Sequence, residues 1–161
     1  MKKSLLLLVC FIGLSIGAHA QKGMSGIGGN IGAFIPFDEG LESMGGLQLK
    51  YYYNLSDNFR LQPSLMLNFS DRELMPGGSL DVHYLIGYLK TVRPYVSVGV
   101  SAASGHKHYR HDITVFGPSL GLGLNWRITH GLSMQIEAKG ILNVLEAGGY
   151  ANIALGLSYN F

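Results

Sequence analysis

The sequence is poor in charge and almost devoid of cysteine, and both shortages narrow what the protein can be. Asp, Glu, Lys and Arg make up 14% of the 161 residues, and Cys10 is the only cysteine. One cysteine supports neither a disulfide framework nor a thiolate metal centre. Twelve basic residues are nearly balanced by ten acidic ones. This balance argues against nucleic-acid binding, which needs clustered Lys and Arg facing phosphates.

The start of the chain has the features of a secretory signal peptide. Two lysines precede an apolar run from Leu5 to Ile16, which closes on Ala18-His19-Ala20. The run has roughly a dozen residues, short of the ~20 that a helix needs to cross a bilayer. We therefore expect export through the Sec pathway and cleavage before Gln21.

The predicted cleavage divides the chain into a signal peptide, 1–20, and a mature domain, 21–161. A lipid on Cys10 is an alternative, but this residue lies inside the apolar run with more apolar residues after it. Loss of Lys2 and Lys3 leaves ten basic residues against ten acidic ones, so the mature chain is neutral. Its length, about 140 residues, is that of a single domain.

After the leader, apolar and small polar residues alternate with period two, which is the pattern of β-strands. No segment has the i, i+3, i+4 apolar spacing of a helix. About eight stretches alternate in this way, each followed by a turn rich in Gly, Asn, Asp, Ser or Pro. The expected strands are Met24 to Ile35, Gly45 to Asn54, Phe59 to Phe69, Leu80 to Leu89, Pro94 to Ala103, Thr114 to Trp126, Leu132 to Leu142 and the terminal stretch from Ile153.

The composition of the polar face decides which side of the strands is inside. Alternation alone fits both a soluble barrel with an apolar cavity and a membrane barrel with an apolar exterior. Here the polar face consists of Gly, Ser, Asn, Gln and Ala with few charges. Such residues make a poor water-facing coat, since soluble surfaces carry about 25–35% charged residues. They suit the narrow lumen of an eight-stranded barrel, which side chains just fill.

Aromatic residues gather at one predicted rim, as in the interfacial girdles of membrane barrels. If both termini lie on the same side, the girdle on that periplasmic side contains Tyr51, Tyr53, Phe59, Tyr88, Trp126, Tyr159 and Phe161. Phe69 and Phe116 fall toward the opposite rim. We therefore predict an all-β fold: an eight-stranded antiparallel up-and-down transmembrane β-barrel. We expect the last strand to return beside the first and close the sheet, and we interpret the end of the chain at Phe161 in this way.

Three stretches resemble the bacterial outer-membrane protein beta-barrel domain family, which is porin-like and similar in size to the transmembrane domain of outer membrane protein A. They are RPYVSVGVS (Arg93 to Ser101), GPSLGLGLNW (Gly117 to Trp126) and GLSYNF (Gly156 to Phe161). The resemblance implies a Gram-negative outer membrane, periplasmic termini and extracellular loops. It also implies that Phe161 is part of the signal read by the outer-membrane barrel assembly machinery. No residue follows Phe161, so we expect no peptidoglycan-binding domain.

Strand parity points a set of ionisable side chains into the lumen. Buried charges are costly unless they pair or stay hydrated. We expect a network with Glu137 as its acidic centre, within reach of Lys139 on the same strand face or of Lys50 or Arg60 across the lumen. The predicted lumenal set is Lys50, Arg60, Asp81, His83, Glu137 and Lys139. It would either fill and hold the barrel or gate it for small ions and solutes.

Four outer loops are expected, and one of them is rich in histidine. The predicted loops are Pro36 to Ser43, Ser70 to Ser79, Ser104 to Asp112 and Asn143 to Gly149. His106, His108 and His111 have spacings that could ligate Cu(II), Ni(II) or Zn(II), but we favour a hydrated, weakly basic loop.

Catalysis has weak support in the sequence. The residues Ser104, His106 and Asp112 are the one candidate for a nucleophile with its base, but closeness in a loop is poor evidence for a triad. The glycines of GMSGIGGNIG lack the following helix that a phosphate-binding loop needs, and we interpret them as close packing in a strand. We expect no enzyme activity, metal or cofactor.

Two functions remain open. A structural or surface-interaction role in the envelope would use the barrel as a scaffold for its loops. Porin-like passive diffusion of small solutes or ions is the alternative, although eight strands leave little room for a channel. Expected partners are outer-membrane lipid and the assembly machinery, and no residue identifies an extracellular ligand.

Overall fold

The computed structural model describes residues 25–37, 43–70, 74–86, 91–107, 110–129, 131–145 and 148–161. Within these ranges, side chains are described everywhere except at 105–107 and 110–113. The predicted signal peptide and Tyr88 of the predicted girdle lie outside the described residues, as does His108.

Eight β-strands make up the described fold. They are β1 (Ser25–Pro36), β2 (Met44–Asn54), β3 (Phe59–Phe69), β4 (Leu74–Leu85), β5 (Val92–Lys107), β6 (Arg110–Arg127), β7 (Leu132–Leu142) and β8 (Gly149–Asn160). Within the described ranges, no helix is long and apolar enough to cross a membrane.

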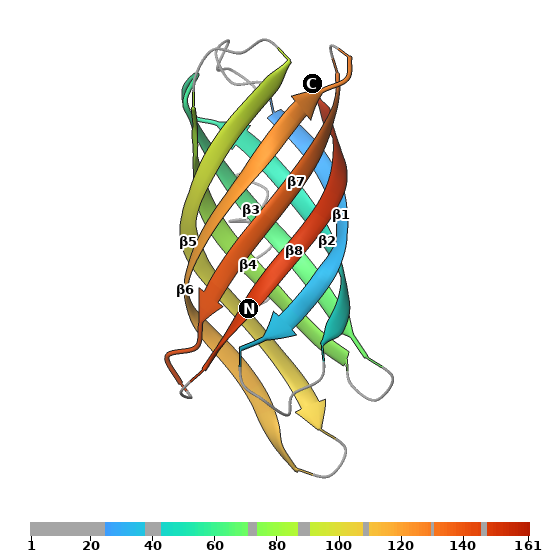
Figure 1. Cartoon of the computed structure of the whole chain (residues 1–161), viewed down its shortest axis with the longest axis vertical. Helices are drawn as coiled ribbons and strands as arrows, with labels where there is room; N and C mark the ends of the chain where they lie inside the picture. The colour runs from blue at the N-terminus through green and yellow to red at the C-terminus, as the bar shows by residue number, and fades with distance from the viewer. Residues whose placement is uncertain are drawn as a thin grey trace, which may run out of the picture.

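The strands form one closed barrel in which each strand pairs antiparallel with its neighbours in sequence (Figure 1). Closure comes from β1 and β8, whose register runs from Gly26 opposite Asn160 to Pro36 opposite Tyr150. A closed sheet leaves no edge strand with unpaired backbone groups, which lipid would penalise. The predicted fold class, an eight-stranded antiparallel barrel, is confirmed.

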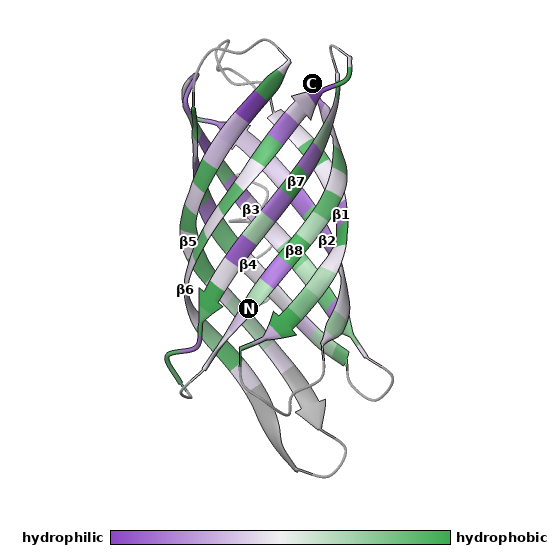
Figure 2. Cartoon of the chain, viewed as in Figure 1, coloured by the Kyte–Doolittle hydropathy of each residue, from purple (hydrophilic) through white to green (hydrophobic). Residues whose placement is uncertain are grey.

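Hydrophilic and hydrophobic residues alternate along the strands (Figure 2), and the large hydrophobic side chains that are exposed make the outer side of the barrel wall apolar. Leu65 is 67% exposed and Leu120 is 66% exposed, whereas their inward neighbours Ser64 and Ser119 are buried. Exposure of such a surface to water would be unfavourable, whereas in the hydrocarbon of a membrane the apolar side chains contact no water. The apolar side of the alternation therefore faces out, as predicted.

We call the barrel end at Ser25 and Phe161 the proximal rim and the opposite end the distal rim. The backbone N–H of Ser25 donates to the carbonyl of Phe161 at 3.1 Å, and that of Phe161 donates to Ser25 at 2.8 Å. The proximal rim carries most of the predicted girdle: Phe59, Trp126, Tyr159 and Phe161 are exposed, and Tyr51 and Tyr53 are half-buried. Tyr84 is a further exposed aromatic residue there, with its ring centroid 5.2 Å from that of Phe59.

The predicted loop from Ser70 to Ser79 is wrong in its second half, because β4 begins at Leu74. In the sequence, Pro76 and the two glycines after it indicate a turn. In the structure Pro76 lies opposite Leu67 of β3, and pairing with β5 begins only at Gly77. A strand tolerates a proline where no neighbouring strand needs a hydrogen bond from the backbone N–H that proline lacks. The strand also ends at Leu85, earlier than the predicted Leu89.

The predicted loop from Ser104 to Asp112 is also wrong, because β5 continues to Lys107 and β6 starts at Arg110. These two strands pair with each other out to Lys107 opposite Arg110, with a register shift between Gly105 and Lys107. The polar composition of this segment concealed its extended backbone. We call the ends of these two strands, from Ser104 to Lys107 in β5 and from Arg110 to Asp112 in β6, the distal hairpin; Figure 1 shows β5 and β6 projecting beyond the other strands at the distal rim.

Candidate functional site in the barrel lumen

The lumen contains all six ionisable side chains that parity assigned to it, and all six are buried. They come from four strands: Lys50 from β2, Arg60 from β3, Asp81 and His83 from β4, and Glu137 and Lys139 from β7. The structure brings five of them into two ion pairs and one stacked ring. Arg60 lies apart, nearer the proximal rim.

Glu137 and Lys50 form an ion pair across the barrel. Lys50 Nζ lies 3.1 Å from Glu137 Oε1, and both side chains are at most 1% exposed. The two residues are 87 positions apart in sequence, and β1 and β8 lie between their strands. Asn30, with its amide oxygen turned toward Lys50, accepts a further hydrogen bond from Nζ at 2.9 Å. The pair thus ties opposite sides of the wall together.

Neutral donors complete the Glu137 site. Tyr95 donates its hydroxyl to Glu137 Oε2 at 2.8 Å, and Gln135 Nε2 donates to the same oxygen at 2.9 Å. Gln135 Nε2 also contacts the Tyr95 hydroxyl, and Tyr52 donates to Gln135 Oε1 at 2.7 Å. A buried carboxylate with a cation and several donors has the partners that offset its desolvation.

Asp81 is a second acidic centre. It pairs with Lys139, the lysine that was expected within reach of Glu137. Lys139 Nζ lies 2.6 Å from Asp81 Oδ2. Ser79 donates to the same oxygen at 2.6 Å, and Ser119 donates to Oδ1 at 3.1 Å. Lys139 and Glu137 share a strand face, but each pairs with a residue from another strand. Glu137 is therefore not the single acidic centre that strand parity predicts.

His83 packs against an aromatic residue of the lumen. Its ring stacks on Tyr95 with centroids 4.5 Å apart and planes 9° apart. Neither ring nitrogen has a hydrogen-bond partner within the described part of the chain. No group of three or more His, Cys, Asp or Glu side chains among the described residues is arranged to hold a metal.

An apolar layer fills the distal part of the lumen, and sequence reasoning missed it. It consists of Phe34, Met44, Met75, Ala103, Val115, Ile141 and Tyr150. Phe34 and Tyr150 stack at 4.6 Å between centroids. We call this set the distal apolar layer. Strand parity could have revealed most of it, but Met75 fell in a segment assigned to a loop.

Arginines dominate the proximal end of the lumen. Arg60 Nε donates to Asn54 Oδ1 at 2.9 Å, and its guanidinium carbon lies 5.1 Å from the centre of the Tyr52 ring. Arg93 and Arg127, which the sequence analysis did not single out, line the same opening. From the proximal rim to the distal rim, the lumen therefore contains three layers: arginines, then ion pairs, then apolar side chains.

Most of the histidine-rich segment and of the candidate catalytic cluster lies outside the side chains that the structure describes. The side chains of His106, His111 and Asp112 lie outside the described side chains, and His108 lies outside the described residues. Ser104 is exposed on β5.

The solved structures that share this architecture include the following three. The N-terminal barrel domain of Pseudomonas aeruginosa OprF is 20% identical, with a TM-score of 0.67 over 87% of this chain and 100% of that one. Yersinia pestis Ail is 15% identical, with a TM-score of 0.66 over 88% and 100%. Neisserial surface protein A is 11% identical, with a TM-score of 0.67 over 86% and 97%. At these identities the likeness shows the fold.

No curated protein matches the chain in sequence. The model of the outer membrane protein beta-barrel domain matches residues 4–161, nearly the whole chain. With the closed eight-stranded barrel and its apolar exterior, this match establishes that the protein belongs to the outer membrane protein beta-barrel domain family and is located in the outer membrane.

Proposed function

We propose that the protein is a closed structural barrel that stabilises the outer membrane and presents its distal hairpin at the cell surface. The observation that carries this proposal is the filling of the lumen. Two buried ion pairs occupy its middle, and the distal apolar layer lies beyond them. Eight strands enclose a space that side chains just fill.

Closure by these layers opposes transport. A solute would have to separate Lys50 from Glu137 and Lys139 from Asp81, each of which is held by several hydrogen bonds. It would then have to pass the stacked rings of Phe34 and Tyr150. Separation of a buried pair leaves uncompensated charge, which is strongly unfavourable.

The distal hairpin supports the surface role. β5 and β6 have 16 and 18 residues, whereas the other strands have 11 or 12. The extra length pairs only within the hairpin and contributes nothing to barrel closure. Its sequence, from Ser104 to Asp112, contains three histidines, one lysine and one arginine.

The same proposal places the proximal rim in the periplasm and the distal hairpin outside. Export would use the signal peptide 1–20, and Phe161 would be read by the barrel assembly machinery during insertion. Outer-membrane lipid would contact the apolar exterior. We assign no catalytic role to the chain, and its surface partner is not identified by the described residues.

Planar-bilayer conductance separates the closed barrel from porin-like diffusion. We expect no conductance steps from wild type or from Glu137→Ala, because the distal apolar layer remains in both. Liposome co-flotation confirms that each protein has inserted. Step conductance in wild type, or swelling of wild-type liposomes in small sugars or amino acids, would overturn the closed-barrel proposal. Steps in Glu137→Ala alone would identify the ion pair as a gate and would equally reject it.

A further inference from the structure

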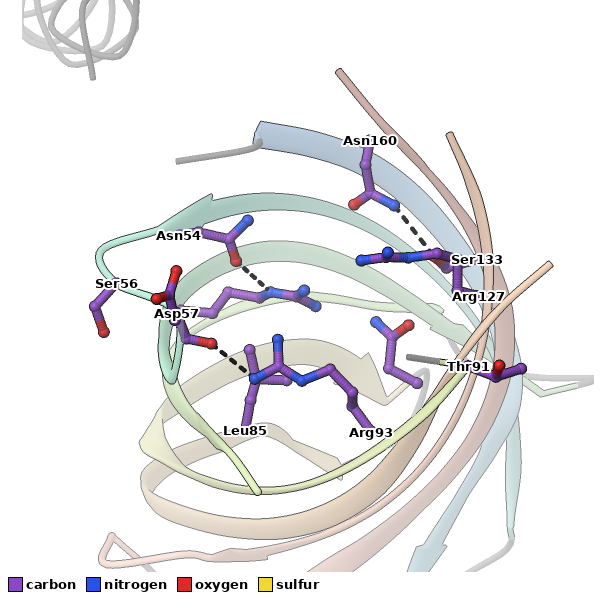
Figure 3. A pocket seen from close by; sticks show the side chains of 11 residues that line it. Asn54, Ser56, Asp57, Leu85, Thr91, Arg93, Arg127, Ser133 and Asn160 are labelled. Atoms are coloured by element: carbon purple, nitrogen blue, oxygen red, sulfur yellow. Dashed lines mark hydrogen bonds between the residues drawn. The ribbon is translucent and has the colours of Figure 1, made fainter. Parts of the chain in front are cut away.

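The proximal opening of the lumen is a polar cavity of about 190 Å³ (Figure 3). Arg60 of β3, Arg93 of β5 and Arg127 of β6 all line it. Figure 3 shows the Arg93 and Arg127 side chains extending across the opening. Asp57, Asn125, Ser133 and Asn160 also line it.

The three guanidinium groups have no carboxylate partner among the described residues. Arg60 donates to an amide oxygen of Asn54, and Arg93 Nη2 donates to the backbone carbonyl of Asp57 at 2.7 Å. The Nε atom of Arg93 is buried without a hydrogen-bond partner in the described part of the chain. In the same lumen, Lys50 and Lys139 each have a carboxylate. The positive charge is therefore balanced in the middle of the barrel and unbalanced at its proximal mouth.

Mutual repulsion makes this arrangement unfavourable when the cavity holds only water. Three positive charges line this one cavity, and like charges brought close together repel each other. Asp57 is the one acidic residue lining the cavity, and it meets Arg93 through its backbone oxygen. An anion in the cavity would offset the repulsion and give the Arg93 Nε a hydrogen-bond acceptor.

The chemistry of the lining favours an oxyanion. The planar fork of N–H donors in arginine matches the oxygens of phosphate, with short charge-assisted hydrogen bonds. The amide of Asn125 and the hydroxyl of Ser133 lie in the same lining and add neutral donors. Asn160 Nδ2 donates to Ser133 Oγ at 3.1 Å, which leaves the Ser133 proton free for a ligand. We propose that the proximal mouth is a binding site for phosphate-type oxyanions, with Arg60, Arg93 and Arg127 as its cationic ligands. Such a group comes either from a free phosphate or from a phospholipid headgroup at the rim.

Calorimetric titration of inorganic phosphate into the full mature chain, folded in phosphate-free non-ionic micelles at low salt, tests the site. We expect saturable binding to wild type. Arg127→Gln is expected to weaken it at least about tenfold, because one charge-assisted contact is lost. Arg127 is exposed at the rim, so this variant should fold. Asp57→Asn should strengthen binding a few-fold, because it removes the negative charge and keeps the backbone carbonyl that Arg93 uses.

Lys107→Gln is the matched control, because it removes one positive charge at the opposite end of the barrel and should leave phosphate affinity unchanged. Absence of saturable phosphate binding to wild type would overturn a free-phosphate site. Titration of short-chain phosphatidylglycerol then tests the lipid source, and a loss of its binding in Arg127→Gln would support the same site. Equal affinities in wild type and Arg127→Gln for both ligands would overturn the proposal, whatever the conductance experiment shows.

Discussion

At the scale of single residues, the lumen shows how a chain with few charges uses them. Glu137 and Lys50 are withdrawn from water, and this costs several kcal/mol per ion unless partners replace the lost hydration. The partners are present: Asn30, Tyr95 and Gln135 each contact one member of the pair. A buried pair of this kind adds little net stability to the fold. Removal of either member is strongly destabilising, because the other charge then stays buried without a partner.

Glu137→Ala is predicted to destabilise the barrel by about 3–5 kcal/mol, because Lys50 remains buried without its carboxylate. The double variant Lys50→Met with Glu137→Met should recover most of this loss, since an apolar pair of similar size carries no uncompensated charge. Guanidinium unfolding in micelles, followed through the fluorescence of Trp126, the only tryptophan, measures both. A double variant that lost as much stability as Glu137→Ala, or more, would contradict the pairing.

At the scale of elements, Gly123 on the inner face of β6 makes room for the large side chain of Tyr95 from β5. A Cβ at Gly123 would clash with the Tyr95 ring and lie 2.5 Å from the Ile136 carbonyl oxygen. Tyr95 therefore reaches Glu137 because β6 has no side chain at this position. Gly140 of β7 differs, because the nearest atom to its Cβ would be the Leu120 carbonyl oxygen at 3.8 Å.

Gly123→Ala should destabilise the barrel by about 1–3 kcal/mol through overpacking against Tyr95. Gly140→Ala is the matched control, expected to be neutral or to stabilise by roughly 0.4–1 kcal/mol through the unfolded chain. Guanidinium midpoints of the two variants against wild type provide the comparison. If both alanines had the same effect, the close approach of Tyr95 to β6 would not matter for stability.

Sequence patterns predicted some elements well and others poorly, for a physical reason. The strands Phe59–Phe69 and Leu132–Leu142 were predicted with the bounds that the structure has. Their alternation is strong because one face meets lipid and the other meets the lumen. β4 and the distal hairpin were missed where local composition signalled a turn, since pairing with a neighbouring strand can extend a segment rich in Gly, Pro or charge.

At the scale of the whole molecule, the lumen is layered and the two rims differ. The proximal rim carries aromatic side chains outside and arginines inside, while the distal rim carries the longest hairpin. If the proximal rim faces the periplasm, the distal hairpin meets the cell exterior. The orientation therefore decides which of these features an external partner can reach.

A recognition sequence for a site-specific endoprotease, inserted after His108, should be cleaved in intact cells. The same insertion after Thr129, in the proximal turn between β6 and β7, should be cleaved only after lysis. Immunoblotting of the fragments reads out both. Cleavage of the Thr129 insertion in intact cells would reverse the orientation and reject the surface role of the distal hairpin.

The sequence by itself determined the class of fold, the lipid-facing side and the identity of the lumenal ions, because period-two alternation assigns each side chain to one face regardless of its distant partners. It could not determine which ions pair. Lys50 meets Glu137 across 87 positions, and Lys139 prefers Asp81 to its near neighbour. Such pairing depends on barrel closure, strand stagger and the space beside Gly123, which exist only in the tertiary structure. The distal apolar layer and the convergence of three arginines were decided in the same way, since each combines side chains that only the closed sheet brings together.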